Sequence, residues 1–212
     1  DPTHIASGPC APDPSTYQDA LDILKRFAIQ PPLAVATHLA RGARGEIPET
    51  PKPGDRVFVK TENRVIATAR QSLQAAADYF TSHGITPAIL GDSVTGEARE
   101  VGKVYGALAR EIRSHGRPWS PPVALISGGE CTVTLRGTGR GGRCAEFLLS
   151  LAVDLDGAAD IHALACDTDG IDGSEDNAGA LLHPDSLQRA AHKQLNAATL
   201  LDQNDAYRFF ET

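Results

Sequence analysis

The sequence has 212 residues, of which 41% are hydrophobic and 22% charged, so it can hold one large α/β domain or parts of two. Its formal net charge of −7 at pH 7 argues against a nucleic-acid-binding protein and against binding to a membrane through basic residues. No apolar run approaches the roughly 20 residues that cross a bilayer, and no signal peptide is visible. The sequence therefore predicts a cytoplasmic protein without a membrane partner.

Two further features of composition bear on the chain as a whole. It begins with Asp1 and contains no methionine, and it stops at residue 212 in the expected last turn of a helix, so we expect truncation at both ends. The four cysteines lack C-x-x-C spacing, which favours reduced thiols over a disulfide or zinc framework. Thiol catalysis stays open as a lesser alternative, because Cys131, Cys144 and Cys166 flank the motifs below, whereas Cys10 does not.

The first half of the chain is expected to alternate helices with short strands. A capping box at residues 15–18 and helical spacing of apolar residues behind it predict the first helix. Such alternation is typical of a parallel α/β layer. In chain order we expect helices at 17–28 and 33–39, an extended connector at 47–54, strands at 57–59 and 65–68, a helix at 69–83, a strand at 85–90, a loop at 91–96 and a helix at 97–115.

A proline-rich segment at residues 117–122 is the best candidate for a linker, and it divides the chain into domains at 1–117 and 118–212. The fold class predicted is α/β, with two α/β domains, the first built on a parallel sheet. The second domain is expected to contain strands at 123–127, 132–135 and 161–166, a glycine-rich turn at 137–143, and helices at 145–155, 186–196 and 205–210.

The glycine-rich turn is the most informative motif, because it joins a strand to the start of a helix. Such a turn exposes backbone N–H groups at the positive end of the helix dipole, beside Gly141 and Gly142. Arg140 and Arg143 add planar cations suited to phosphate or carboxylate, and Arg143 lies at the helix start, where these donors converge. The motif predicts an anion site; the alternative is a hairpin tip with two solvated arginines.

Ser127, Gly128, Gly129 and Glu130 directly follow an expected strand, at the kind of strand end where α/β folds bind ligands. The two glycines would let a ligand approach the backbone, while the serine hydroxyl and the glutamate carboxylate offer polar contacts. A tight hairpin turn is the alternative at these positions.

The third motif is an acidic loop at residues 166–173, in which Asp167, Asp169 and Asp172 alternate after a strand. Carboxylates so spaced could hold Mg²⁺ through one or two oxygens, with Asp167 and Asp169 as the predicted ligands. The alternative is an Asx-rich turn that caps the next helix. Neither a P-loop nor a dinucleotide-binding fingerprint is present.

The three motifs, in the order S-G-G-E-x-T-V-T, G-x-G-R-G-G-R-x-x-E-F and D-T-D-G-I-D-G, resemble those of the MOFRL family, the glycerate 2-kinases. Some members carry the older label hydroxypyruvate reductase. The first half agrees at residues 5–9, 12–15, 62–64 and 92–100. The resemblance implies ATP-dependent phosphorylation of D-glycerate to 2-phosphoglycerate with Mg²⁺, in a cleft between the N-terminal domain and a mixed-sheet MOFRL domain.

The resemblance also implies roles for particular residues. Arg143 matches the family's catalytic arginine, which would stabilise the transferring phosphoryl group. Asn63 matches a polar position on the other domain's side of the cleft. The remaining expected contacts to substrate or nucleotide are Ser127, Gly128, Gly129, Glu130, Arg140, Gly141 and Gly142.

This chain departs from the family pattern at three places. Cys144 and Ala145 replace an Asn-Gln pair, and both the family's catalytic lysine and its closing glycine- and threonine-rich segment lie outside the chain. We therefore expect this fragment to be inactive alone. An NAD(P)H-dependent hydroxypyruvate reductase and a non-catalytic binding homologue are the alternatives, and the sequence gives no prediction of oligomeric state.

Overall fold

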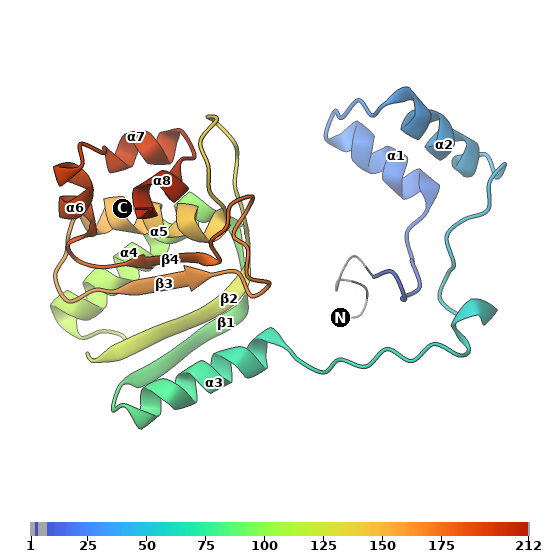
Figure 1. The fold of residues 1–212 in the computed structure, drawn as a ribbon. Coiled ribbons are helices and arrows are strands. Elements are labelled where there is room, and N and C mark those ends of the chain that lie inside the picture. The colour runs from blue at the N-terminus through green and yellow to red at the C-terminus, as the bar shows by residue number, and fades with distance from the viewer. Residues whose placement is uncertain (1–2, 4–7, 212) are drawn as a thin grey trace. The chain divides into compact units, whose positions relative to one another are not determined.

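The computed structural model describes residue 3 and residues 8–211, which form two compact units, Asp1–Thr68 and Ala69–Thr212 (Figure 1). Part of the expected family motif at residues 5–9 lies outside the described residues. No helix among the described residues is long and apolar enough to cross a membrane.

The first unit contains two helices, α1 (Tyr17–Arg26) and α2 (Leu33–Ala43), that pack on each other. The capping box of α1 lies one residue later than the sequence predicted. Thr16 is the N-cap: its hydroxyl accepts from the Asp19 N–H at 3.1 Å, and the Asp19 carboxylate accepts from the Thr16 N–H at 2.8 Å. The two helices approach closely at Gly42, where a Cβ atom would collide with the ring of Tyr17.

The strands predicted at 57–59 and 65–68 are wrong. Arg56–Phe58 forms a 3₁₀ turn, and residues 65–68 are irregular. The valines there have high strand propensity, but a strand also needs a neighbour to pair with. The described part of the first unit offers none.

The second unit begins with α3 (Ala69–Ser82), β1 (Thr86–Glu97), α4 (Ala98–His115) and β2 (Val123–Thr132). The two strands pair in parallel, with Thr86 opposite Val123 and Glu97 opposite Thr132. Figure 1 shows α3 and the α4–α5 pair on different sides of these strands. The strand β1 lies before the expected domain boundary at 117/118 and β2 lies after it, so the paired strands belong to one compact unit of this chain. A division of the longer protein at that point stays a prediction.

Both strands run further than the sequence predicted. The loop expected at 91–96 belongs to β1, which continues through two register irregularities, and residues 128–132 belong to β2. Of the second strand expected at 132–135, Thr132 is the last residue of β2 and residues 133–135 are irregular. Glycines often interrupt strands, but within a strand they can also mark bulges, as the register irregularities of β1 show.

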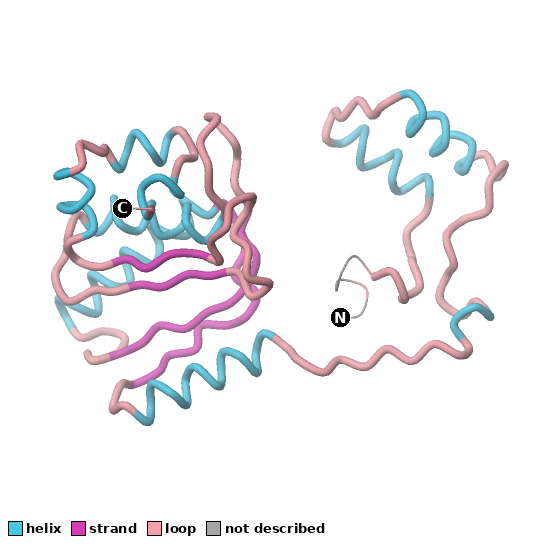
Figure 2. The backbone as a smooth tube through the Cα atoms, viewed as in Figure 1, coloured by secondary structure: helices cyan, strands magenta, loops and turns pink. Residues whose placement is uncertain are grey.

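The rest of the second unit is α5 (Arg143–Leu155), the antiparallel pair β3 (Ala163–Cys166) and β4 (Gly179–Leu182), α6 (Ser186–His192), α7 (Ala197–Asp202) and α8 (Ala206–Phe210) (Figure 2). The sequence did not predict β4 or α7. The α/β class is confirmed: a parallel pair is followed by an antiparallel pair, with helices against both.

Helix α5 is the centre of the hydrophobic core. Its Leu148 and Leu149 are fully buried, and the helix packs against α4, the β3–β4 pair and the C-terminal helices. Helices α4 and α5 approach closely at Gly102, where a Cβ atom would lie 2.8 Å from the carbonyl oxygen of Phe147. The tightly packed α5 gives its first residue, Arg143, a fixed base.

Candidate active site

Arg143, the first residue of α5, joins the three sequence motifs through two ion pairs. Its Nη1 lies 2.9 Å from Glu130 Oε1 in β2, and its Nη2 lies 2.5 Å from Asp167 Oδ2, just after β3. The Asp167 side chain is 12% exposed and that of Glu130 is 75% exposed. The ends of β2 and β3 and the start of α5 therefore meet at one guanidinium group.

The surroundings of Arg143 keep its guanidinium charged. Burial lowers the pKa of Arg143, but the hydrogen bond that it donates to Asp167 and the charges of Asp167 and Glu130 outweigh burial and raise that pKa. A guanidinium has five N–H donors, more than two carboxylate contacts use. Since its side chain is 36% exposed, Arg143 can still donate to an incoming anion.

The helix N-terminus beside Arg143 already binds a carboxylate of the protein. Asp172 is completely buried, and its two oxygens accept from the N–H groups of Cys144 at 2.9 Å and Ala145 at 2.8 Å. A buried helix start must have its free N–H groups satisfied, and Asp172 does this for two of them. These two N–H groups are therefore not available to a ligand, whereas the guanidinium of Arg143 is; the predicted anion site at Gly141 and Gly142 stays a prediction.

The glycines of the 137–142 loop are explained by contacts within the protein. A Cβ atom on Gly142 would lie 2.2 Å from Asp172 Oδ1, and one on Gly139 would lie 2.6 Å from the carbonyl oxygen of Gln203. Gly141 has φ +145°, a conformation that disfavours other residues. The loop is glycine-rich because it lies pressed between the acidic loop and the segment before α8.

Arg140 lies three residues from Arg143 but has different partners. Its Nη1 is 3.2 Å from Glu175, and its guanidinium stacks over the ring of Tyr207 at 4.7 Å from the centroid. Its backbone N–H donates to Asp205 at 3.1 Å. The structure thus does not bring Arg140 to the carboxylates that contact Arg143.

Of the four residues in the Ser127–Glu130 motif, only Glu130 contacts Arg143. The Ser127 hydroxyl accepts a hydrogen bond from the Tyr105 hydroxyl at 2.7 Å. Gly129 has φ +150° and is pressed against Val94 in β1, while Gly128 makes an ordinary contact with Leu73 of α3. The turn that the sequence offered as an alternative does not form, since the segment lies within β2.

Of the two metal ligands predicted in the acidic loop, Asp167 lies in a cluster of possible metal ligands. Ligand atoms of Cys144, Asp167 and Asp172 lie within 4.8 Å of one another. Asp169 is outside that group; its carboxylate accepts from the Ile171 N–H at 3.1 Å, as in an Asx turn.

The donors of this cluster do not fit Mg²⁺, which prefers oxygen ligands. Burial first, and then the carboxylates of Asp172 and Asp167, raise the pKa of the Cys144 thiol to about 12, so it stays protonated. Both Asp172 oxygens already accept from the helix, and Asp167 is paired with Arg143. The cluster thus offers little beyond one carboxylate oxygen for a hard cation.

A buried polar network that the sequence did not predict anchors the start of the glycine-rich loop. Arg99 of α4 donates to Glu146 of α5, with its Nη2 2.6 Å from Oε1, and Asn204 donates to both Glu146 oxygens at 3.1 Å. The Asn204 side-chain oxygen accepts from the N–H groups of Arg136 at 2.6 Å and Gly137 at 3.1 Å. Glu146 lies in an otherwise apolar run, and that was the signal for a buried partner.

Asn63 belongs to the first unit, where its side-chain amide donates to the Cys10 carbonyl at 3.2 Å. Its place at the cleft stays a prediction.

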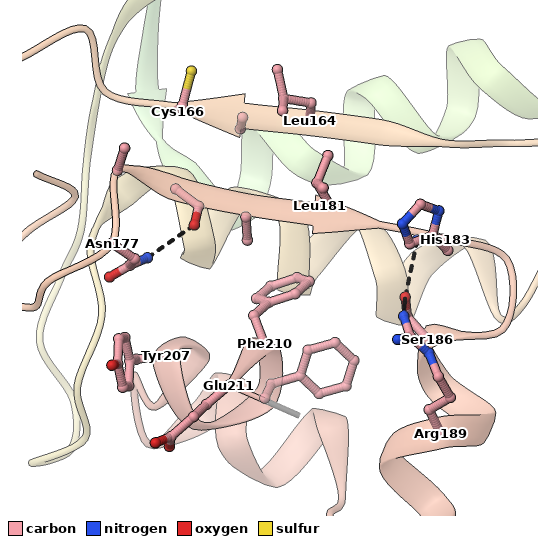
Figure 3. Close-up of a pocket in the computed structure, with 15 residues that line it drawn as sticks. Leu164, Cys166, Asn177, Leu181, His183, Ser186, Arg189, Tyr207, Phe210 and Glu211 are labelled. Carbon is pink, nitrogen blue, oxygen red and sulfur yellow. Dashed lines mark hydrogen bonds between the residues drawn. The ribbon is translucent and has the colours of Figure 1, made fainter. Parts of the chain in front are cut away.

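A pocket of about 580 Å³ lies beside the hairpin of β3 and β4 rather than at Arg143 (Figure 3). Its walls come from the two strands, α6 and α8, and neither Arg143 nor its carboxylate partners line it. Asn177 lies at one end, and its buried side-chain oxygen has no partner among the described residues.

Comparison with known proteins agrees with these motifs. Residues 123–212 match the MOFRL family, and residues 1–40 match a domain of unknown function, DUF4147. A Pyrococcus horikoshii protein named glycerate 2-kinase is 36% identical over 208 residues, which cover 96% of this chain and 46% of that protein. An Agrobacterium vitis protein with a provisional hydroxypyruvate reductase name is 46% identical over 213 residues, covering 100% of this chain and 47% of that protein.

Among solved structures, a glycerate kinase from Thermotoga maritima matches with a TM-score of 0.72 at 30% identity, over 100% of this chain and 48% of that one. The chain spans about half the length of the curated relatives it matches. Residues 123–212 are therefore a domain of the MOFRL family, in a chain whose relatives include proteins named glycerate kinase and hydroxypyruvate reductase.

Proposed function

We propose that the full-length protein is a glycerate 2-kinase, which transfers a phosphoryl group from ATP to the 2-hydroxyl of D-glycerate and gives 2-phosphoglycerate. The observation that carries this proposal is the meeting of all three family motifs at Arg143, through Glu130 and Asp167. The relatives named glycerate kinase, at 30–36% identity, support it. We place this activity in the cytoplasm on the strength of the sequence prediction alone.

In this proposal Arg143 binds the transferring phosphoryl group. Its planar donors suit phosphoryl oxygens, and a fixed positive charge stabilises the charge that those oxygens carry during transfer. Glu130 and Asp167 hold the guanidinium in place before substrate binds, because each occupies one terminal nitrogen. An arriving anion competes with exposed Glu130 more readily than with Asp167, whose side chain is 12% exposed.

Asp172 and Asn204 act on Arg143 from a distance. Asp172 fixes the first turn of α5, and Asn204 fixes the start of the loop that leads into it. ATP would bring Mg²⁺, which adds positive charge at the phosphates. The cluster of Cys144, Asp167 and Asp172 does not fit that ion.

We further propose that residues 1–212 alone are inactive. No residue of the described site is assigned to take the proton from the glycerate hydroxyl, and the chain spans about half of its relatives.

Hydroxypyruvate reductase is the second candidate, and the names of two Agrobacterium vitis relatives favour it. A hydride transfer needs a dinucleotide site, and the sequence carries no fingerprint for one. A binding homologue without catalysis is the third, since Cys144 and Ala145 replace the amide side chains expected beside Arg143.

One experiment separates these candidates. The full-length protein is assayed for ADP release with ATP, Mg²⁺ and D-glycerate, and in parallel for oxidation of NADH and NADPH by hydroxypyruvate. Glycerate-dependent ADP release supports the kinase. Oxidation of the nicotinamide without ADP release overturns it in favour of the reductase, and glycerate binding without either reaction favours the binding homologue.

A further inference from the structure

Two histidines face each other at the end of the β3–β4 hairpin, away from the site at Arg143. Ala163 pairs with Leu182 in the antiparallel register, so the next cross-strand pair is His162 and His183. Their Nδ1 atoms lie 3.2 Å apart, and their rings meet edge to face with centroids 5.4 Å apart. Both residues are exposed.

The backbone around this pair is well fixed. The His183 N–H donates to the Ser186 hydroxyl at 2.9 Å, as Figure 3 shows, and the Ser186 N–H donates to the His183 carbonyl at 3.0 Å. Ser186 itself is buried at the start of α6. On the other strand, His162 directly precedes Ala163, whose partner is Leu182. The two rings are therefore presented from two anchored strand ends.

Two ring nitrogens so close together are suited to share one cation. A neutral imidazole has one N–H and one acceptor nitrogen, so two facing Nδ1 atoms can share one proton but repel each other when both are protonated. A metal ion between the rings removes this repulsion, because both Nδ1 atoms are then unprotonated and coordinate the ion through their lone pairs. Imidazole nitrogen is the ligand that Zn²⁺, Cu²⁺ and Ni²⁺ commonly take in proteins.

The distance between the nitrogens matches such an ion. With metal–nitrogen bonds of about 2.05 Å, an angle of about 103° at the metal separates two nitrogens by the observed spacing. That angle lies between the tetrahedral and octahedral values that these ions adopt. The 3.2 Å between the Nδ1 atoms is thus compatible with chelation without a large movement of the hairpin.

We propose that His162 and His183 bind one divalent transition-metal ion between their Nδ1 atoms, with water completing its coordination. The site is separate from Arg143, because Asp167 follows His162 by five steps of extended chain, or about 16 Å. It stands independently of the kinase proposal. The bound ion ties the ends of the two strands together and stabilises the folded hairpin.

Zn²⁺ is the probe that tests this site, in isothermal titration calorimetry on the full-length protein at pH 7.5. We compare the wild type with His162→Asn and His183→Asn, and with His115→Asn, an exposed histidine on α4 that keeps the pair intact. We expect one Zn²⁺-binding event that either hairpin substitution weakens by at least about tenfold and that His115→Asn leaves unchanged.

A thermal melt gives an independent readout. Zn²⁺ should raise the melting temperature of the wild type and of His115→Asn, and raise it less in the two hairpin variants. The proposal is overturned if the wild type binds no Zn²⁺, leaving a histidine–histidine hydrogen bond alone. It is equally overturned if Zn²⁺ binds both hairpin variants as tightly as the wild type, because the ion then lies elsewhere, such as at Cys144.

Discussion

Arg140 and Arg143 stand three residues apart in one loop, yet their surroundings differ in kind. Arg143 begins a 13-residue buried helix and is clamped by carboxylates from two strand ends. Arg140 is half-exposed, stacks on Tyr207 and pairs with Glu175 and Glu211. The sequence could not tell these two arginines apart by type, only by position.

The two environments differ in how firmly they fix a guanidinium, which matters for a charge that takes part in catalysis. A guanidinium held from two sides on a rigid helix is fixed before a ligand arrives, and such preorganisation is what makes a charge effective in catalysis. The Arg140 guanidinium, which lies on an aromatic ring and pairs with Glu175 and exposed Glu211, mainly holds the C-terminal segment to the loop.

The largest expected effect is the loss of Arg143. In the full-length protein, Arg143→Ala should lower kcat by about 100-fold or more, by analogy with the removal of one oxyanion donor. Arg140→Ala is the matched control, because it removes the same group three residues away, and it should change kcat by less than about threefold. Steady-state kinetics with glycerate and ATP measure both; equal losses in the two variants would abolish the distinction between the arginines.

The next effect concerns the carboxylate that holds the start of α5. Asp172→Ala leaves two N–H groups without their partner in a buried place, and should lower the free energy of unfolding by about 2 kcal/mol. Asp176→Ala is the control, since Asp176 is exposed in the same loop and contacts only the Tyr207 hydroxyl. Urea unfolding followed by circular dichroism compares them. An Asp172→Ala protein as stable as the control would mean that the helix start does not depend on Asp172.

A smaller effect tests the predicted magnesium ligand Asp169. Asn at this position can still accept from the Ile171 N–H, so Asp169→Asn removes the charge and keeps the turn. If Asp169 contacts Mg²⁺, the half-saturating Mg²⁺ concentration should rise by about threefold or more. An unchanged magnesium titration would leave Asp169 as a turn residue.

The sequence predicted the helices better than the strands. It also predicted the residues of the candidate site better than the residues that hold Arg143 in place. Helix α4 and its glycine end follow from local spacing, and residues 98–115 are helical as expected. Strand limits depend on partners elsewhere in the chain, so the extension of β1 to Glu97 and the pairing of β4 could not be predicted from local pattern. The three motifs were predicted at strand ends and they do meet at Arg143, although Ser127–Glu130 lies within β2 and the strand expected before the glycine-rich turn does not form.

What supports Arg143 was not predictable, for a physical reason. Arg99 donates to Glu146 and to the Leu201 carbonyl, and Asn204 donates to Glu146; these contacts join residues about 50 to 100 positions apart, and no local spacing encodes them. The role of Asp172 is similar: its place in the loop indicated a cation ligand, whereas in the fold it binds helix N–H groups. Local chemistry identifies candidate groups, and only tertiary contacts decide which of them remain free for a ligand.

The smallest expected effect concerns Cys144, the neighbour of Arg143. Burial, followed by the carboxylates of Asp172 and Asp167, raises the pKa of this thiol from 9.0 to about 12. At pH 8.5 iodoacetamide should therefore modify Cys144 at least about tenfold more slowly than exposed Cys166, because the thiolate is the reacting form. Mass spectrometry of each peptide over time measures both rates in one sample.

The same shift of the Cys144 pKa makes the stability of the fold depend on pH in a defined direction. The raised pKa means that the folded state keeps the proton while the unfolded thiol loses it, so this contribution is complete below pH 9 and is lost as pH rises towards 12. A Cys144→Ala protein should lose less stability over that range than the wild type. Equal alkaline losses in the two proteins, or rapid alkylation of native Cys144, would mean that the thiol at the start of α5 is not shielded by burial and by the two aspartates.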